Sequence, residues 1–487
     1  MSSSIDKKIG KATVWSSVTE VVAKLITPIV NMVLARLLAP EAFGIIATIT
    51  MVISFAEIFT DAGFQKYIIQ HEFENEEELD NSTNVAFWTN IFLSLCICTI
   101  IFLFRHKLAS LVGNGGLGNS ISIASILIII VAFSSIQMAR YKRDFDFKSL
   151  FFIRIITSLV PLIVTIPLAI ILKNYWALLI GTFTTHISNA LILTLKSKWK
   201  PKFYYDFKLL KQMISFTVWT LFESISIWLI AYADIFIISN YFNDYYLGLY
   251  KTSISVVNSF LAIITAAITP VLFSALSRYQ NDDIKYKETF YNFQQLVAIF
   301  VIPMGIGVFV YHDLVTQILL GDAWMEASEF VGYWGLTSSI VIVYSYFSSE
   351  VYRSKGNPKL SLLMQLIHLS VLMPSLMISV KYGYRAIYIT RSLVRLQDVI
   401  LAILVMSLSY KFKITLMIKN TIPIVVSSMI MGIVGYVTTS LFNNIIIQII
   451  SVFICVLIYF VILMCFKSPR KTILNLLSKK SLNLFNE

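Results

Sequence analysis

Charged residues are scarce in this chain. Asp, Glu, Lys and Arg make up 14% of its 487 residues, whereas hydrophobic residues make up 57%. A soluble chain of this length would form about three or four domains and carry about 25% charged residues. The composition therefore excludes a soluble enzyme. About fourteen membrane helices of about 20 apolar residues each would account for the hydrophobic residues, which predicts an all-α, polytopic membrane protein.

Cysteines and catalytic motifs are scarce as well. The four cysteines, Cys96, Cys98, Cys455 and Cys465, each lie in a long apolar run, where a thiol behaves as a small hydrophobic group. Neither a disulfide framework nor a zinc-binding spacing is present. The sequence also lacks the P-loop, HExxH and GxSxG motifs. We therefore expect no catalytic residue, no metal and no cofactor, and a transporter rather than an enzyme.

The apolar residues gather in fourteen runs that are long enough to cross a membrane. These runs cover approximately residues 12–35, 42–64, 82–104, 119–138, 150–172, 175–195, 213–241, 247–275, 290–311, 328–350, 359–380, 384–409, 418–440 and 445–466. Because fourteen is an even number, both ends of the chain should lie on the same side of the membrane.

The basic residues indicate which side that is. The net charge of +12 comes from 39 Lys and Arg against 27 Asp and Glu, an excess that nucleic-acid-binding proteins also show. Here, however, most basic residues lie in loops on the side of the termini. The loops of the other side carry only Arg36, Arg105, Lys107, Lys173, Lys381 and Arg385. Because cytoplasmic loops are the ones enriched in Lys and Arg, we predict that both termini are cytoplasmic and that no nucleic acid is a partner.

The chain resembles itself at a spacing of about 204 residues. Thr13-Val14-Trp15 recurs as Thr217-Val218-Trp219, and the pairs Gly44 with Gly248, Thr48 with Thr252 and His106 with His312 follow in the same order. Two copies of six helices around a central cavity is a transporter architecture. We predict a six-helix lobe over 1–200, a second over 201–412, two additional membrane helices over 413–466, and a cytoplasmic amphipathic tail over 467–487.

Five basic residues lie within the predicted spans. Arg154 lies near the cytoplasmic end of its span, where its side chain can reach the interface, and the other four are Lys24, Lys251, Arg391 and Arg395. A charge at this depth is costly, so each is a candidate for function. Arg391 and Arg395 are four residues apart and therefore share a helix face. Since Lys and Arg attract phosphate strongly where the dielectric is low, we predict a cationic, substrate-binding cavity for an anionic substrate such as a diphosphate.

Acidic residues also lie within the spans, at Glu20, Glu57, Glu223, Asp234 and Asp398. They could take up protons or sodium, so that a proton or sodium gradient drives transport. The alternative is that they form buried ion pairs that fix the register of the helices. The spacing does not decide between these two roles. We interpret His186 and His368 as packed interior residues.

Three segments carry a family resemblance. Residues 35–44 read ARLLAPEAFG and are followed by DAGF at 61–64, residues 234–238 read DIFII and are followed by LGLY at 247–250, and residues 143–148 read RDFDFK. They resemble Wzx-type polysaccharide and O-antigen flippases, the lipopolysaccharide exporters of the multidrug/oligosaccharidyl-lipid/polysaccharide exporter superfamily. The resemblance covers essentially the whole chain, although residue 39 is Ala where the family usually has Gly.

This resemblance implies an activity. A member of the family would translocate undecaprenyl-diphosphate-linked oligosaccharide repeat units across the bacterial inner membrane by alternating access, for surface polysaccharide or exopolysaccharide synthesis. Its partners would be the lipid-linked oligosaccharide, membrane lipid, a polysaccharide polymerase and glycosyltransferases. Two alternatives remain open: a cation-coupled multidrug antiporter of the same superfamily, in which the carboxylates would matter most, and a non-transporting membrane scaffold for polysaccharide assembly.

Overall fold

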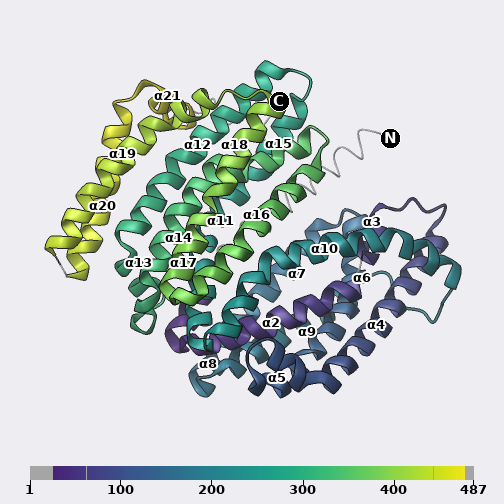
Figure 1. Ribbon diagram of the computed structural model, residues 1–487. Helices are drawn as coiled ribbons and strands as arrows, with labels where there is room; N and C mark the ends of the chain where they lie inside the picture. The colour runs from purple at the N-terminus through teal and green to yellow at the C-terminus, as the bar shows by residue number, and fades with distance from the viewer. Residues whose placement is uncertain (1–25, 62, 443, 478–487) are drawn as a thin grey trace. The chain divides into compact units, whose positions relative to one another are not determined.

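A computed structural model describes residues 26–61, 63–442 and 444–477 (Figure 1). The regular secondary structure of these residues is helical, and none of them forms a strand. Thirteen helical segments of this described part are long and apolar enough to cross a membrane. They correspond one to one to the second through fourteenth predicted spans, and the shorter helix Ile26–Leu37 covers the described part of the first. The predicted fold class is confirmed.

The chain consists of two compact units, Met1–Thr252 and Ser253–Glu487. The lobe boundaries expected from the repeat stay a prediction. The helices of the first unit are α2 (Pro40–Asp61), α3 (Phe64–Gln70), α4 (Glu76–Leu111), α5 (Gly118–Ala124), α6 (Ile126–Arg143), α7 (Phe147–Val160), α8 (Ile166–Leu172), α9 (Tyr175–Lys196) and α10 (Phe207–Tyr241), with short turns η1 (Gly115–Leu117) and η2 (Pro161–Thr165).

Helix α11 (Asp244–Arg278) begins in the first unit and continues in the second. The remaining helices are α12 (Asp283–Val310), α13 (His312–Leu319), α14 (Ser328–Val341), α15 (Ser348–Ser354), α16 (Pro358–Ser379), α17 (Tyr384–Val394), α18 (Leu396–Tyr410), α19 (Ile414–Leu441), α20 (Ile445–Met464) and α21 (Lys467–Leu477), with turns η3 (Asp322–Ala327), η4 (Ile342–Tyr346) and η5 (Val380–Tyr382). Within this unit α12 packs between α14 and α19, and α20 packs against α19.

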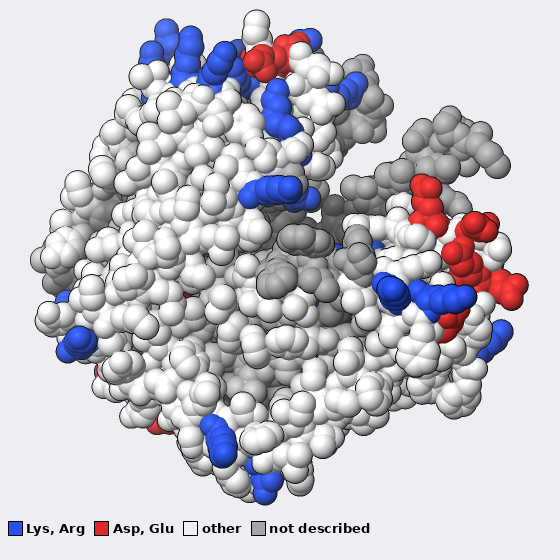
Figure 2. All heavy atoms as spheres, turned by 45° about the vertical axis from the view of Figure 1, so that its right-hand side comes forward, with Lys and Arg blue, Asp and Glu red and all other residues white. Residues whose placement is uncertain are grey.

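The surface of the protein is largely apolar, as a membrane protein requires. Basic and acidic side chains cover only small parts of the face shown in Figure 2. Side chains such as Ile163, Ile171 and Leu408 are each more than 70% exposed although they are fully hydrophobic. In water such a surface would be an aggregation hazard, whereas in a bilayer it faces lipid.

The short helix α3 is docked by an arginine. Its residues Phe64, Tyr67 and Ile68 are buried in a core that α4 and α6 share. Arg143, the last residue of α6, donates from Nη1 to the backbone oxygens of Ile68 (2.8 Å) and His71 (2.7 Å) at the C-terminal end of α3. The guanidinium thus satisfies carbonyls that a helix end leaves without a partner.

The first turns of α11 cross α2 in direct backbone contact. A Cβ atom placed on Gly44 would overlap the carbonyl oxygen of Asp244, and one placed on Gly248 would overlap the carbonyl oxygen of Pro40. The two contacts are related by the predicted repeat, because Gly44 and Pro40 correspond to Gly248 and Asp244. Only glycine allows two helix backbones to approach this closely.

The same turn ends α6 in the first unit and α15 in the second. At the end of α6 the N–H groups of residues 144, 145 and 146 donate to the carbonyls of 140, 142 and 141, and at the end of α15 those of 355, 356 and 357 donate to 351, 353 and 352. The residue with positive φ is Phe145 in the first turn (56°) and Gly356 in the second (76°). Helix α4 ends with the same three hydrogen bonds, from residues 112, 113 and 114 to 108, 110 and 109, so the pattern is a common helix ending and the internal repeat stays a prediction.

The side-chain amide of Gln295 joins helix α21 to α12 and α19. The buried Gln295 of α12 donates from Nε2 to Ser468 Oγ (2.8 Å) and to the backbone oxygen of Asn420 in α19 (3.2 Å), and its Oε1 accepts from Thr472 Oγ1 (3.0 Å). Both Ser468 and Thr472 lie on α21. The amide therefore joins three helices.

We expect Gln295→Leu to release α21. The substitution removes all three hydrogen bonds, each worth about 1 kcal/mol, so amide exchange over residues 467–477 should accelerate about tenfold or more. Hydrogen–deuterium exchange of the purified protein measures this. The control is Gln294→Leu, because Gln294 donates to the backbone oxygen of Val343 and not to α21. Equal exchange of α21 in the wild type and Gln295→Leu would contradict the assignment.

Candidate functional site

The predicted cations divide between the two units. Arg391 on α17 and Arg395, at the junction of α17 and α18, lie together in the second unit. Lys251 belongs to the first unit, where its Nζ lies 5.4 Å from the ring centroid of Tyr232. Lys24 lies outside the described residues. The structure therefore brings Arg391 and Arg395 together, and we refer to them as the arginine pair.

The arginine pair stacks on one indole ring. The Cζ atoms of Arg395 and Arg391 lie 3.9 Å and 5.2 Å from the ring centroid of Trp334. Arg395 also donates from Nη1 to Ser338 Oγ at 2.6 Å. Trp334 and Ser338 are four residues apart on α14 and so present one face to the arginine pair.

Trp334 is itself firmly held. Its side chain is 2% exposed, and its Nε1 donates to Asn258 Oδ1 on α11 at 3.0 Å. The ring of Phe330, one turn earlier on α14, packs edge-on against it at 5.8 Å. Buried indole N–H groups need such an acceptor. Trp334 was not among the predicted site residues, because a tryptophan in an apolar run carries no signal that separates a residue supporting a site from an ordinary core residue.

The carboxylate of Asp398 contacts the histidine His368. His368 Nδ1 on α16 lies 3.1 Å from Asp398 Oδ1 on α18, and 3.4 Å from Gln397 Oε1. His368 is buried, as predicted, and also has this polar partner. Ser338, Arg395, Asp398 and His368 all lie near the middle of their spans in sequence, the depth at which transporters bind substrate.

Of the predicted carboxylates of the first unit, Asp234 has hydrogen bonds that are well defined. Asp234 on α10 is 4% exposed and accepts a hydrogen bond from Tyr250 Oη at 2.7 Å and another from the backbone N–H of Ile235 at 2.8 Å. Glu57 is half-buried on α2. Glu223 lies in α10, but its side chain is outside the description, and Glu20 lies outside the described residues altogether. Their role in ion coupling stays a prediction.

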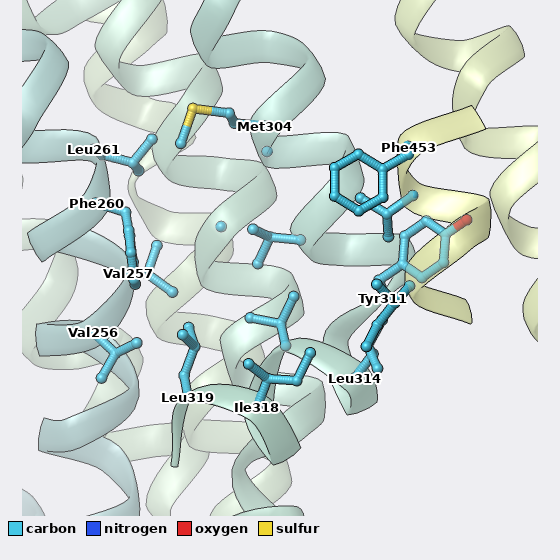
Figure 3. Close-up of a pocket in the computed structure, with 16 residues that line it drawn as sticks. Val256, Val257, Phe260, Leu261, Met304, Tyr311, Leu314, Ile318, Leu319 and Phe453 are labelled. Carbon is cyan, nitrogen blue, oxygen red and sulfur yellow. The ribbon is translucent and has the colours of Figure 1, made fainter. Parts of the chain in front are cut away.

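The second unit also contains two adjoining apolar cavities, of about 380 and 680 Å³. They share Met304, Val308, Tyr311, Val315 and Val452, and we call them together the apolar groove. Figure 3 shows side chains of α11, α12, α13 and α20 converging on the smaller cavity. The Tyr311 hydroxyl is engaged with Ser451 Oγ at 2.8 Å. Such a lining suits a hydrocarbon chain.

The apolar groove and the arginine pair share two helices. On α11, Val257 lines the groove and the next residue, Asn258, accepts from Trp334. On α14, Gly335 lines the groove and the preceding residue, Trp334, carries the arginine pair. The groove and the tryptophan that contacts the arginine pair are therefore built on the same two helices, α11 and α14. Among the described residues, no group of three or more His, Cys, Asp or Glu is placed to hold a metal ion.

Comparison with known proteins identifies the family. The sequence profile described as polysaccharide biosynthesis protein matches residues 33–329, more than half of the chain. The chain belongs to this family. The resemblance to polysaccharide exporters that the sequence predicted is thereby confirmed.

Similarity to individual curated proteins agrees with this family assignment. The chain is 22% identical over 367 residues to the lipopolysaccharide biosynthesis protein WzxC of Escherichia coli (strain K12). The alignment covers 74% of this chain and 70% of WzxC. Matches to curated relatives span between 63% and 70% of those relatives' lengths.

Solved structures show the same fold. The lipid II flippase MurJ in its inward closed conformation superposes with a TM-score of 0.76 at 16% identity, over 93% of this chain and 98% of MurJ. An inward-facing multidrug resistance MATE family transporter of the MOP superfamily superposes with a TM-score of 0.61 at 12% identity, over 80% of this chain and 94% of that transporter. At these identities the likeness shows the fold alone.

Proposed function

We propose that this chain translocates an undecaprenyl-diphosphate-linked oligosaccharide across the bacterial cytoplasmic membrane for surface polysaccharide synthesis. The observation that carries the proposal is that the second unit holds both an arginine pair, stacked on Trp334 of α14, and an apolar groove, lined in part by α11 and α14. A lipid-linked glycan has the same two parts, a charged diphosphate and a long hydrocarbon chain. The polysaccharide biosynthesis family and the MurJ-like fold support this assignment.

Each part of the substrate has a matching surface. The arginine pair offers planar guanidinium groups, which bind phosphate oxygens through two parallel hydrogen bonds. The larger cavity of the groove, about 680 Å³, is within the size range of ligand sites and could take up part of the isoprenoid chain. The sugars would then extend into water-filled space.

The mechanism in this proposal is alternating access between two six-helix lobes, with both termini cytoplasmic. A proton or sodium gradient would supply the energy through the carboxylates Glu20, Glu57, Glu223 and Asp234. The protein partners would be glycosyltransferases, which build the lipid-linked unit, and a polysaccharide polymerase, which consumes it after export.

The similarity to a MATE transporter favours a second candidate, a cation-coupled multidrug antiporter. In that function the arginine pair would repel the substrate, because drugs of this class are cations. The electrostatics of the second unit therefore favours an anionic substrate over a drug cation.

Reconstitution tests the proposed function. Purified full-length protein in liposomes should transfer a fluorescent undecaprenyl-diphosphate-linked oligosaccharide between leaflets faster than protein-free liposomes do, measured by dithionite quenching of the outer leaflet. The double variant Arg391→Gln/Arg395→Gln, at an equal amount of folded protein, is the control, since it removes both charges and keeps polar side chains. Transfer no faster than in protein-free liposomes would leave the scaffold alternative, and efflux of a cationic dye in its place would indicate the antiporter.

A further inference from the structure

We infer that the loop of residues 197–206, which joins α9 to α10, binds the head groups of anionic phospholipids in the membrane leaflet that it faces. Its exposed lysines contact the lipid phosphates, and its exposed aromatic rings insert beside the acyl chains. The loop belongs to the first unit. This inference goes beyond the proposed function and does not rest on it, because it concerns the surrounding bilayer and not the transported lipid.

The backbone of the loop is fixed to helix α4. The backbone N–H of Lys202 donates to Asn84 Oδ1 at 2.9 Å, and the carbonyl oxygen of the same residue accepts from Trp88 Nε1 at 2.8 Å. The hydroxyl of Tyr205 lies 3.0 Å from Thr89 Oγ1. All three partners belong to α4, so the loop has a defined conformation along this helix.

These contacts place the loop at the membrane interface. The predicted apolar span of α4 covers residues 82–104, so Asn84 and Trp88 lie within about 9 Å of the end of that span. The polar head groups begin at this level of the bilayer, and aromatic side chains are enriched there. Side chains that project from the loop therefore meet lipid head groups.

The aromatic side chains of the loop are exposed although they are held in place. Phe203 is 95% exposed, and its ring stacks on Trp88 with the centroids 4.8 Å apart. Tyr204 and Tyr205 are also exposed, and Phe207 at the start of α10 is 76% exposed. In water this apolar surface would be unfavourable, whereas the interfacial region of a bilayer is the preferred environment of aromatic rings.

The same segment is strongly basic. Residues 197–211 contain five lysines and a single acidic residue, Asp206. All five lysines are exposed: Lys198, Lys200, Lys202, Lys208 and Lys211. The carboxylate of Asp206 accepts from the backbone N–H of Lys208 at 2.7 Å and so caps α10. Each lysine near an anionic membrane surface raises the binding constant about fivefold, so the segment favours an anionic leaflet.

A loop of the second unit has similar lysines without the exposed rings. Residues 198–200 read KWK, and residues 411–413, between α18 and α19, read KFK. The central ring is buried in both, Trp199 against α4 and Phe412 against α12. Helix α19 begins directly after the second loop, whereas the first continues into the exposed aromatic residues 203–205. The second loop therefore provides a control for charge alone.

Hydrogen–deuterium exchange of the full-length protein in lipid nanodiscs tests the inference. Phosphatidylglycerol discs present anionic head groups, and phosphatidylcholine discs with the same acyl chains present zwitterionic ones. We expect the backbone amides of residues 197–206 to exchange about tenfold more slowly in phosphatidylglycerol. Equal exchange in the two lipids would overturn the inference and leave the exposed rings to a protein partner. The same slowing by inorganic phosphate in phosphatidylcholine discs would also overturn it.

Matched charge variants assign the effect to the loop. Replacing Lys198, Lys202 and Lys208 by Gln should abolish the difference in exchange between the two lipids. The control removes three exposed lysines of the second unit, by Lys411→Gln, Lys413→Gln and Lys419→Gln, and should keep the difference. A difference that survives the first set of substitutions, or that is lost in the second, would contradict the inference. An unfolding temperature equal to that of the wild type in phosphatidylcholine shows that each variant is folded.

A Phe203→Ser variant tests the aromatic part of the site. Insertion of the ring does not depend on the charge of the head group, so this variant should exchange faster over residues 197–206 in both lipids. It keeps every lysine, and the slower exchange in phosphatidylglycerol should therefore remain. Exchange of Phe203→Ser identical to that of the wild type in both lipids would show that the ring does not enter the bilayer and would overturn this part of the inference.

Discussion

An Arg395→Gln variant is expected to abolish surface polysaccharide while the protein accumulates to normal levels. The substitution removes the cation that lies 3.9 Å above Trp334 and the donor to Ser338. Loss of one charge from a buried, hydrogen-bonded anion contact costs about 2 to 5 kcal/mol, so transport should fall about 100-fold. The measurement is surface polysaccharide in a deletion strain that carries the variant, with an immunoblot for the amount of protein in the membrane.

Two further variants make the result specific. Arg395→Lys keeps the charge but loses the planar stacking and the paired donors, so we expect partial export. Arg385→Gln removes an arginine whose charge Glu329 already neutralises, and whose side chain is 69% exposed, so export should continue. Normal export by Arg395→Gln, or equal loss in Arg385→Gln, would contradict a special role for the arginine pair.

A Gly44→Ala variant is expected to be strongly destabilised. Its new methyl group would overlap the backbone carbonyl oxygen of Asp244, and backbone cannot move aside as a flexible side chain does. Overpacking at a rigid contact lowers the free energy of unfolding by about 1 to 3 kcal/mol. Because the methyl group must push two helix backbones apart, we expect a loss near the upper end of this range. Thermal unfolding of the purified protein in detergent should therefore occur at a clearly lower temperature.

The predicted repeat provides a second test at Gly248, and Gly307 of α12 provides a control. Gly248→Ala should behave like Gly44→Ala, since its methyl group would overlap the carbonyl oxygen of Pro40. Gly307→Ala should be neutral or slightly stabilising, because nothing lies within 4 Å of the added atom and Ala favours the helix. Unfolding temperatures that are the same for Gly44→Ala and Gly307→Ala would show that the two backbones do not touch as described.

The sequence predicted the membrane spans well because hydropathy is a local property. A run of about 20 apolar residues has no other stable arrangement than a buried or lipid-facing helix. The helix ends differ from the prediction where polar residues continue a helix past the apolar run, as in α4, which begins at Glu76 behind the cap of Asn75. Its acidic first turn suits the positive end of the helix dipole.

The site was only partly predictable. Spacing placed Arg391 and Arg395 on one face, because the period of a helix is fixed. It could not find Trp334, since the contact joins α14 to α17 and depends on tertiary packing. The apolar groove was equally hidden, because Met304 and Val452 look like any other apolar residue of a span. The match of Gly44 with Gly248 was visible in sequence, whereas their mutual contact was not.

The turns that end α6 and α15 share one backbone shape but have different residues at the left-handed position. Phe145 occupies a left-handed backbone position at which Gly356 is free of steric cost, yet both turns form the same three hydrogen bonds. These hydrogen bonds join backbone groups alone, so the turn does not depend on one particular side chain. Glycine is therefore the residue of lowest steric cost at this position, and its absence from a sequence does not exclude the turn.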